Sequence, residues 1–560
     1  MTWYDRLLIC RSAQGKSACE KLVELCRRRF DVALTPAELQ VLNDTASSLD
    51  RSSPEDNAPR PEVRAAFLSW LATDQEARPH IHAKGLRVYS STITDELDLG
   101  KHLQLPSLDF RSCTVTGRII LEASETKGIH FTDCSISKGI EADGVVVHGP
   151  VLLYRTRSDG EIRFINATIE SNLECQGAKL TAEDDALTLD GATIKGDVFL
   201  CQDFECHGEI RMLGTKIDSS VMCTGAKLLG KKYALSLDKA SIGGNLLLNR
   251  KLRCTGTIRM PNCHIEGDLN FIGAEVNEVH CHNMNLLGDL MWRGVQKTPA
   301  TSLNLRGARM RTLRDDEASW PGDQKLELDN LVYGDLILHD NLTQEQLDGG
   351  ALAKEQPLRV ERRIAWLMLQ SAANRLRPQP WMQLSRHLES ANNKVGAKHV
   401  LYKLRCLQAH ESWWLKRRAR IIFAWLEEAP TRVAYFIFLT LLLGTLTFAG
   451  AYRSGAMIPT ARDRDGQPLA GTALNRYPRF NPFIYTLENA VPLVKLGVDD
   501  KWTPDPAHGG KAWFPQYAWL NWLGWFNSYA FLSASRWVII LFGWFQAAVL
   551  GAALTNRFKS

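Results

Sequence analysis

The strongest pattern in this chain is an alternation of apolar and polar positions that repeats through the middle of the sequence. Three segments, GEIRFINATIESNLECQGAKL (160–180), GEIRMLGTKIDSSVMCTGAKL (208–228) and GTIRMPNCHIEGDLNFIGAEV (256–276), align without gaps and begin 48 residues apart. Within each 48-residue period, apolar-x-apolar triplets recur every 11 to 14 residues. A period of two indicates β-strands, and glycines between triplets are typical of tight corners. The pattern predicts a repeat protein whose turns bury their faces against each other.

The predicted fold class is mainly β, with a parallel β-helix (solenoid) over residues 85–340. Two triplets close one turn of roughly 24 residues, so the segment holds about ten turns. At a strand spacing of about 4.8 Å, such a stack is roughly 50 Å long. A pentapeptide-repeat solenoid is the nearest alternative, but no five-residue period holds over this segment.

The 48-residue repeat also predicts where most of the cysteines lie in the solenoid. Cys175, Cys223 and Phe271 are equivalent positions 48 residues apart, and so are Cys206 and Cys254. A position that accepts either Cys or Phe is predicted to point inward, where Cys acts as a small apolar side chain. The 13 cysteines are odd in number and include no CxxC pair, so neither a disulfide framework nor a zinc ribbon is indicated. We expect them to be reduced.

Outward positions supply the candidate binding residues. Arg163, Arg211 and Arg259 each lie between two inward apolar residues, so we expect them on one outer face, two turns apart. Thr188 and Ser236 are predicted to occupy the turns between them, giving an Arg–Thr–Arg–Ser–Arg ladder with guanidinium groups about 10 Å apart. This ladder is a candidate site for an anionic partner through bidentate contacts, and solvated decoration of the sheet is the alternative.

The sequence offers little for cofactor chemistry. His280 and His282 are predicted to share one face of a strand, but no third or fourth metal ligand follows at useful spacing. The chain has no GxGxxG after a strand, no CxxCH and no P-loop motif. We therefore predict no cofactor and no metal, and we assign no catalytic residue.

The segments beside the repeat are predicted to be helical. Residues 1–84 contain short amphipathic stretches, and we interpret them as an N-terminal cap over the open end of the solenoid, which repeat proteins need for solubility. After the repeat, residues 341–430 carry apolar side chains at helical spacing and include a helical hairpin.

Two uncharged apolar stretches predict a membrane domain over residues 431–560. Each covers 20 residues, 433–452 and 537–556, and each is flanked by arginines. About 20 apolar residues suffice for a helix to cross a hydrocarbon core of ~30 Å. A pair of buried core helices is the alternative interpretation.

Basic residues beside these spans predict their orientation. They are Lys416, Arg417, Arg418, Arg420 and Arg432 before the first span, and Arg557 and Lys559 after the second. By the positive-inside rule both termini are predicted to be cytoplasmic, and the connecting segment lies outside. The cluster Lys416, Arg417, Arg418 and Arg420 stands beside Trp and Ile residues, so it is a candidate contact with an anionic membrane surface; an ordinary packed helix is the alternative.

The segment between the spans has a channel-like arrangement. TLENAVPLVKLG (486–497) stands between two spans as the helix and filter do in two-span cation channels. A potassium filter needs a TVGYG-like run, whereas residues 494–498 are VKLGV, in which Lys495 opposes cations. An interfacial or partly re-entrant segment is the preferred interpretation.

The amino-acid composition limits the class of protein but indicates no particular reaction. The 560 residues are 45% hydrophobic and 23% charged, which excludes disorder along most of the chain. Lys and Arg number 67 and Asp and Glu number 62, so the formal charge is only +5 and no nucleic-acid partner is expected.

The chain resembles a group of uncharacterised bacterial membrane proteins. The resemblance rests on VRAAFLSWL (63–71), repeats of the form G-A-x-I-x-G-x-L-x-L, the hairpin QPWMQLSRHLESANNKVGAKHVL (379–401) and FNPFIYTLENAVPLVKLG (480–497). It covers nearly the whole chain, and members often carry the label membrane-associated oxidoreductase. The resemblance implies a location in the bacterial inner membrane and a redox activity.

The residues themselves favour a different function. They predict a scaffold or interaction protein, in which a cytosolic solenoid is anchored in the bilayer and binds a protein partner or a second copy. The alternatives are the membrane-associated oxidoreductase that the resemblance implies and a channel-like membrane protein with a soluble sensor domain.

Overall fold

The structure is a computed structural model of the full chain. It describes residues 13–30, 33–47, 60–339, 355–356, 360–410, 430–463, 466–471, 474–491, 495–508, 525–526 and 528–558. The chain divides into two compact units, Met1–Ala397 and Lys398–Ser560. The basic cluster Lys416, Arg417, Arg418 and Arg420 lies outside the described residues.

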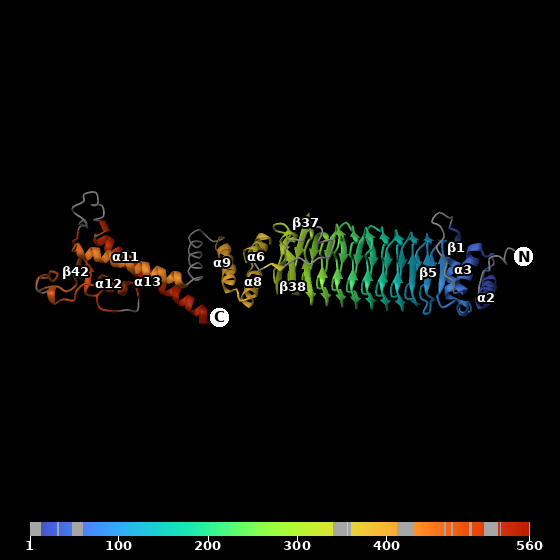
Figure 1. The fold of residues 1–560 in the computed structure, drawn as a ribbon, viewed down its shortest axis with the longest axis horizontal. Helices are drawn as coiled ribbons and strands as arrows, with labels where there is room; N and C mark the ends of the chain where they lie inside the picture. The colour runs from blue at the N-terminus through green and yellow to red at the C-terminus, as the bar shows by residue number, and fades with distance from the viewer. Residues whose placement is uncertain are drawn as a thin grey trace. The chain divides into compact units, whose positions relative to one another are not determined.

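A parallel β-solenoid of about eleven turns forms the body of the first unit (Figure 1). Its strands run from β2 (Leu86–Tyr89) to β40 (Val332–His339). Each strand pairs in parallel with those one turn before and after, as β17 (Leu173–Glu174) does with β13 (Val151–Leu152) and β21 (Val198–Phe199). The predicted fold class is confirmed.

Each turn contributes strands to two sheets, which we call sheet A (20 strands) and sheet B (21 strands). In one middle turn, β16 (Thr168–Ile169) and β17 belong to sheet B, and β18 (Lys179–Leu180) and β19 (Asp185–Thr188) belong to sheet A. Longer strands close the C-terminal end of the stack: β34 (Glu275–His280), β36 (Asp289–Trp292), β37 (Gln296–Asn304) and β38 (Arg309–Asp316). Most other strands have only two residues because a corner follows every few positions.

One apolar side chain from nearly every strand fills the interior. The equivalent core positions of six successive turns are Leu153, Cys175, Leu200, Cys223, Leu248 and Phe271, all fully buried. Cys206 and Cys254 are also buried, so the inward position predicted for these cysteines and for Phe271 is confirmed. Such a column excludes water along the length of the stack, which is the main stabilising contribution.

Polar side chains close the corners of sheet B. Asn172 Oδ1 accepts the N–H of Asp197 at 3.0 Å, and Asp197 Oδ1 accepts the N–H of Ser220 at 2.9 Å. The chain of bonds continues from Ser220 Oγ to the N–H of Asn245 (3.0 Å), from Asn245 Oδ1 to that of Asp268 (2.7 Å) and from Asp268 Oδ1 to that of Asp289 (2.8 Å). Each bond satisfies a backbone donor at a corner. A Cβ at Gly196 would lie only 2.2 Å from Asn172 Oδ1, which explains the glycine there.

Helices cover the N-terminal end of the solenoid. They are α2 (Ala13–Arg29), α3 (Pro36–Ala46) and α4 (Ala65–Thr73), with the 3₁₀ turn η1 (Arg78–His80) after them. The short strand β1 (Glu62–Arg64) extends sheet A by pairing in parallel with β3 (Thr92–Thr94). These helices at the N-terminus agree with the predicted cap.

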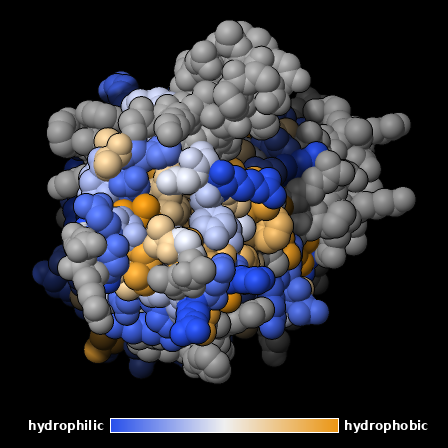
Figure 2. All heavy atoms as spheres, turned by 90° about the vertical axis from the view of Figure 1, so that its left-hand side faces the viewer, coloured by the Kyte–Doolittle hydropathy of each residue, from blue (hydrophilic) through white to orange (hydrophobic). Residues whose placement is uncertain are grey.

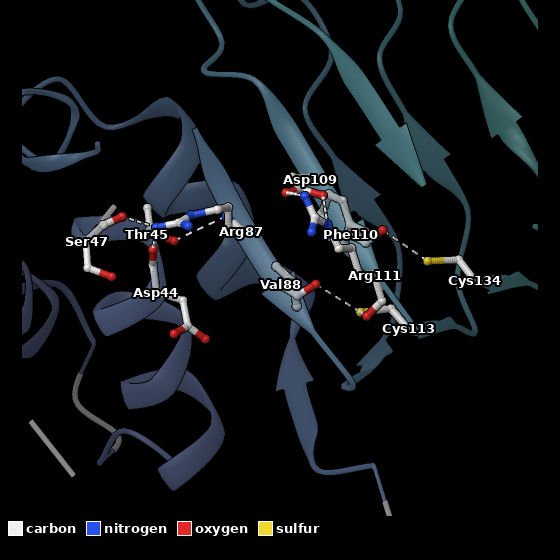
Figure 3. A network of polar contacts seen from close by, with 10 residues as sticks. All are labelled: Asp44, Thr45, Ser47, Arg87, Val88, Asp109, Phe110, Arg111, Cys113 and Cys134. Atoms are coloured by element: carbon white, nitrogen blue, oxygen red, sulfur yellow. Dashed lines mark hydrogen bonds and ion pairs between the residues drawn. The ribbon is translucent and has the colours of Figure 1, made fainter. Parts of the chain in front are cut away.

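Arg87 of β2 joins this cap to the first turn. Its buried side chain donates from Nη2 to the carbonyls of Asp44 and Ser47 at the end of α3 (Figure 3). Its backbone N–H donates to Thr45 Oγ1 at 3.3 Å. A cation at a helix C-terminus satisfies carbonyls that have no partner within the helix, so Arg87 fixes the end of α3 on the solenoid.

Short helices follow the solenoid: α6 (Val360–Met368), α7 (Ala372–Arg375), α8 (Pro378–Ser390) and α9 (Lys394–His410). Arg363 of α6 is fully buried and donates to both carboxylate oxygens of Asp315 at 2.7 Å. Asp315 also accepts from Trp320 Nε1 at 2.9 Å. This buried, bidentate ion pair attaches α6 to the last turns.

The second unit contains α11 (Pro430–Arg453), α12 (Pro482–Ala490), α13 (Tyr529–Phe558) and the antiparallel pair β42 (Met457–Pro459) and β43 (Trp502–Pro504). Among the described residues, two helical windows are long and apolar enough to cross a membrane, Ala434–Arg453 and Tyr529–Val549. The first agrees with the predicted span. The second begins at Tyr529, before the predicted start at Trp537, so Arg536 lies inside the helix.

Candidate functional site

The register of sheet A contains the arginine ladder. Arg163 pairs with Thr188, and Thr188 with Arg211. Arg211 pairs with Ser236, and Ser236 with Arg259. The order Arg–Thr–Arg–Ser–Arg across five consecutive turns is therefore the one that the repeat predicts.

The three arginines are bound to carboxylates of the chain itself. Each pairs with an aspartate one turn earlier, and about a third of each arginine side chain is exposed, between 32% and 34%. The pairs are Arg163–Asp143, Arg211–Asp190 and Arg259–Asp238. Arg211 has a second carboxylate, Asp185, at 3.3 Å. Since these carboxylates neutralise the guanidinium groups, the ladder has little charge left for an external anion.

The two residues that lie between the arginines in the ladder are buried. Thr188 and Ser236 are only 2% and 1% exposed, and Thr188 Oγ1 donates to Glu161 Oε1 at 2.6 Å. Anion binding by Arg163, Arg211 and Arg259 stays a prediction. Their internal ion pairs indicate a role that neither interpretation of the sequence included, in which the arginines join successive turns.

The histidines of the triplet 280–282 gain no further metal ligand. His280 lies beside Arg259 and Asn304 in the register of sheet A, and Cys281 is buried. Within the described ranges, no group of three or more His, Cys, Asp or Glu residues could hold a metal ion.

Sheet B carries a feature that the sequence analysis missed. Its outward side chains form a register column that is mostly apolar, and each of these side chains is partly exposed. The apolar members, here called the apolar column, are Leu152, Phe199, Met222, Leu247, Met291 and Ile337. Glu174, Asn270 and Arg314 interrupt it. The sequence signal was the middle residue of each apolar-x-apolar triplet, which is mostly polar in sheet A and mostly apolar in sheet B.

A polar border lies beside the apolar column. The corner residues Asn172, Asp197, Ser220, Asn245 and Asp268 each stand two positions before a member of the same register column. An apolar centre with a polar rim is the usual anatomy of a protein–protein interface.

In the second unit, α12 packs against both α11 and α13. Two glycines permit this close approach. A Cβ at Gly543 of α13 would lie 1.9 Å from the carbonyl oxygen of Ala490, and one at Gly444 of α11 would lie 2.4 Å from Thr486 Cγ2. Both glycines lie well inside their helices, so α12 reaches the middle of the two apolar windows.

Glu488 fastens the segment that follows α12. Glu488 is 7% exposed, and its carboxylate accepts the backbone N–H groups of four consecutive residues, 496 to 499. Two of these bonds, from Val498 and Asp499, measure 2.8 Å. An acidic side chain with four donors is fully satisfied, so its role is to hold this backbone in place.

Other polar side chains join the same three helices. Arg536 Nε donates to Asn489 Oδ1 at 2.9 Å, and its guanidinium lies 5.8 Å from the Tyr485 ring centroid. Gln546 Nε2 donates to Thr440 Oγ1 at 2.9 Å, between α13 and α11. Seen from the end that carries β42, the surface mixes hydrophilic and hydrophobic residues (Figure 2).

Comparisons of the chain with family models, with curated proteins and with solved structures found no match.

Proposed function

We propose that this protein is a membrane-attached solenoid that acts as a scaffold, with the apolar column of sheet B as its partner-binding face. The column carries this proposal because the solenoid already buries a complete core, so apolar side chains on the outside add nothing to that core. The outward column of sheet A, in contrast, is mostly polar, and its three arginines are paired with aspartates of the chain.

The dimensions of the column suit an elongated protein partner. From Leu152 to Ile337 it crosses eight turn-to-turn steps, or roughly 38 Å at ~4.8 Å each. A stable interface buries about 800 Å² on each partner, so contact over a width of about 20 Å is needed. That width includes the polar border, which supplies the hydrogen bonds that fix the register of the partner.

Attachment to the bacterial inner membrane is the second part of the proposal. Large apolar side chains are exposed on both long helices, including Phe438 and Leu446 of α11 and Leu541 and Trp544 of α13. Contact of such side chains with water is unfavourable, whereas contact with the hydrocarbon core of a membrane is not. The basic residues beside the spans favour cytoplasmic termini.

Site-specific photo-crosslinking tests the scaffold. A benzophenone amino acid in place of Met222 is expected to give discrete protein adducts in intact cells. The same benzophenone amino acid in place of Lys179, which points outward on sheet A, is expected to give none. Leu247→Lys places a charge in the column and is expected to abolish the Met222 adduct. Equal adducts from both positions, or none from Met222, contradict the proposal. Light scattering of the purified full-length chain shows whether the partner is a second copy.

A channel is the second candidate, and α12 favours it. A simple anchor needs no short helix between its spans, and no buried carboxylate that fastens the following segment. Purified protein in liposomes is expected to pass ions in this case, and the current is expected to vanish when residues 482–500 are deleted. Ion flux that survives the deletion, or no flux at all, contradicts the channel.

The redox activity that the resemblance implies has a separate test. A stoichiometric chromophore or metal in the purified protein would favour an oxidoreductase over the scaffold, and would direct attention to His280, His282 and the cysteines.

A further inference from the structure

A cavity of about 290 Å³ lies where the N-terminal cap meets the first turns of the solenoid. Arg78 and His82 line it from η1 and the segment after it, and Gln104, Glu125, Lys127 and His148 line it from the corners of successive turns. These side chains come from parts of the sequence up to 70 residues apart, so only the folded solenoid brings them together.

The cavity has an excess of positive charge. Arg78 Nη1 donates to Gln104 Oε1 at 2.6 Å, which is a neutral partner, and Arg78 Nε is buried without a hydrogen bond. Lys127 is exposed, and in the described part of the chain no carboxylate lies within ion-pair distance of it or of Arg78. The carboxylate in the lining, Glu125, is already paired with His148 at 2.9 Å.

We propose that this cavity binds a compact anion that carries one or two carboxylate or phosphate groups. Arg78 offers a planar donor pair that matches such a group, and Lys127 adds a mobile point charge at the rim. The volume is at the lower end for small-molecule sites, which excludes a large ligand. Because the lining joins the cap to the turns, the bound anion stabilises their contact. This site is independent of the scaffold proposed above.

The test uses the full-length protein in mild detergent, titrated calorimetrically with inorganic phosphate and, separately, with citrate. At least one probe is expected to bind saturably and to raise the melting temperature by mass action. Arg78→Gln and Lys127→Gln are each expected to weaken binding about tenfold. Lys179→Gln, which removes a lysine from the outer face of sheet A, is the matched control and is expected to bind as the parent does.

Three results overturn the proposal. One is the absence of saturable binding of either probe up to ~10 mM, well above the Kd of a specific site. Another is binding that neither Arg78→Gln nor Lys127→Gln weakens, which marks an adventitious ion only. The third is binding to phosphatidylglycerol vesicles but not to the free anions, which would show that the basic side chains of the cavity bind lipid headgroups. If Arg78→Gln unfolds the cap, Lys127→Gln, at an exposed position, decides the outcome.

Discussion

Arg211 and Asp190 lie on adjacent turns of sheet A, with Arg211 Nη2 2.7 Å from Asp190 Oδ2. The other carboxylate oxygen of Asp190 accepts the backbone N–H of Leu213 at 2.9 Å. One carboxylate therefore holds a side chain and the backbone of the next turn. The same kind of pair, Arg259 with Asp238, follows 48 residues later. We infer that the regular 48-residue spacing of these arginines reflects turn-to-turn attachment.

Asp190→Ala is expected to lower the free energy of unfolding of the solenoid by about 1–2 kcal/mol, because it leaves a guanidinium and an N–H without their acceptor. Asp190→Asn is expected to cost less, since its amide oxygen still accepts from Leu213. Urea unfolding followed by circular dichroism measures both. Asp184→Ala, at an exposed loop position, is the control; an equal loss there would mean that the pair contributes nothing specific.

Arg64→Ala is expected to cost about 3 kcal/mol, because it leaves the fully buried carboxylate of Glu38 without its counter-charge. Arg64 donates to Glu38 from Nε at 2.6 Å and from Nη2 at 2.8 Å. A double-mutant cycle with Glu38→Ala measures the coupling. Additive losses would contradict the importance of the pair, although Glu38→Ala alone also removes the capping box with Thr35.

Gly543→Ala is expected to destabilise the C-terminal unit, because the added methyl group would lie 1.9 Å from the carbonyl oxygen of Ala490. Gly551→Ala, in the same helix, meets no atom within 4 Å and is expected to be neutral or slightly stabilising. Thermal unfolding in detergent, followed by tryptophan fluorescence, compares the two variants. Equal melting temperatures would show that α12 does not pack tightly against α13.

His148 is expected to make stability depend on pH. Hydrogen bonds to Glu170 and then to Glu125 raise the pKa of His148 above its ordinary value. A raised pKa means that the stabilisation is complete below about pH 6.5, the ordinary value for histidine, and is lost as the pH rises through the value in the folded protein. Melting temperatures between pH 5.5 and 8.5 are expected to fall with pH, and His148→Gln is expected to flatten the curve.

The same cluster of ionisable side chains is also expected to make stability depend on pH in acid. Bonds to Lys195 and then to His148 lower the pKa of Glu170 to about 2. The stabilisation by Glu170 is therefore present above its ordinary pKa of about 4.3 and is lost as the pH falls towards 2. Glu170→Gln is expected to remove part of the loss of stability in acid.

The core cysteines are expected to resist alkylation until the solenoid unfolds. Burial raises the pKa of Cys206 and of Cys254 to about 12, so neither forms a thiolate at neutral pH. Of the cysteines in the described ranges, Cys406 is the one that is not buried. Mass spectrometry after iodoacetamide treatment is expected to find Cys406 labelled and Cys206 unlabelled in native protein. Rapid labelling of Cys206 would contradict a closed core.

The solenoid is specified by local sequence pattern alone. Alternation of apolar and polar residues allows only one face of a short strand to point inward, and the 48-residue register repeats that choice along the chain. The buried positions of Cys175, Cys223 and Phe271, the order of the arginine ladder and the long apolar segments all follow from local pattern and length.

Which side chains contact each other, in contrast, follows from the folded arrangement of the turns and helices. Asp190 neutralises Arg211 from the preceding turn, and the apolar column exists because residues about 22 to 25 positions apart stack in register. Arg536 lies inside α13, and its hydrogen-bond acceptor, Asn489 of α12, is also a distant partner that local pattern does not indicate. A periodic sequence pattern predicts which side chains are buried, because the inward and outward directions alternate regularly along a strand. An ion pair, a cavity or a helix packed between two others instead needs residues that are far apart in the sequence, and no periodic pattern indicates which residues these are.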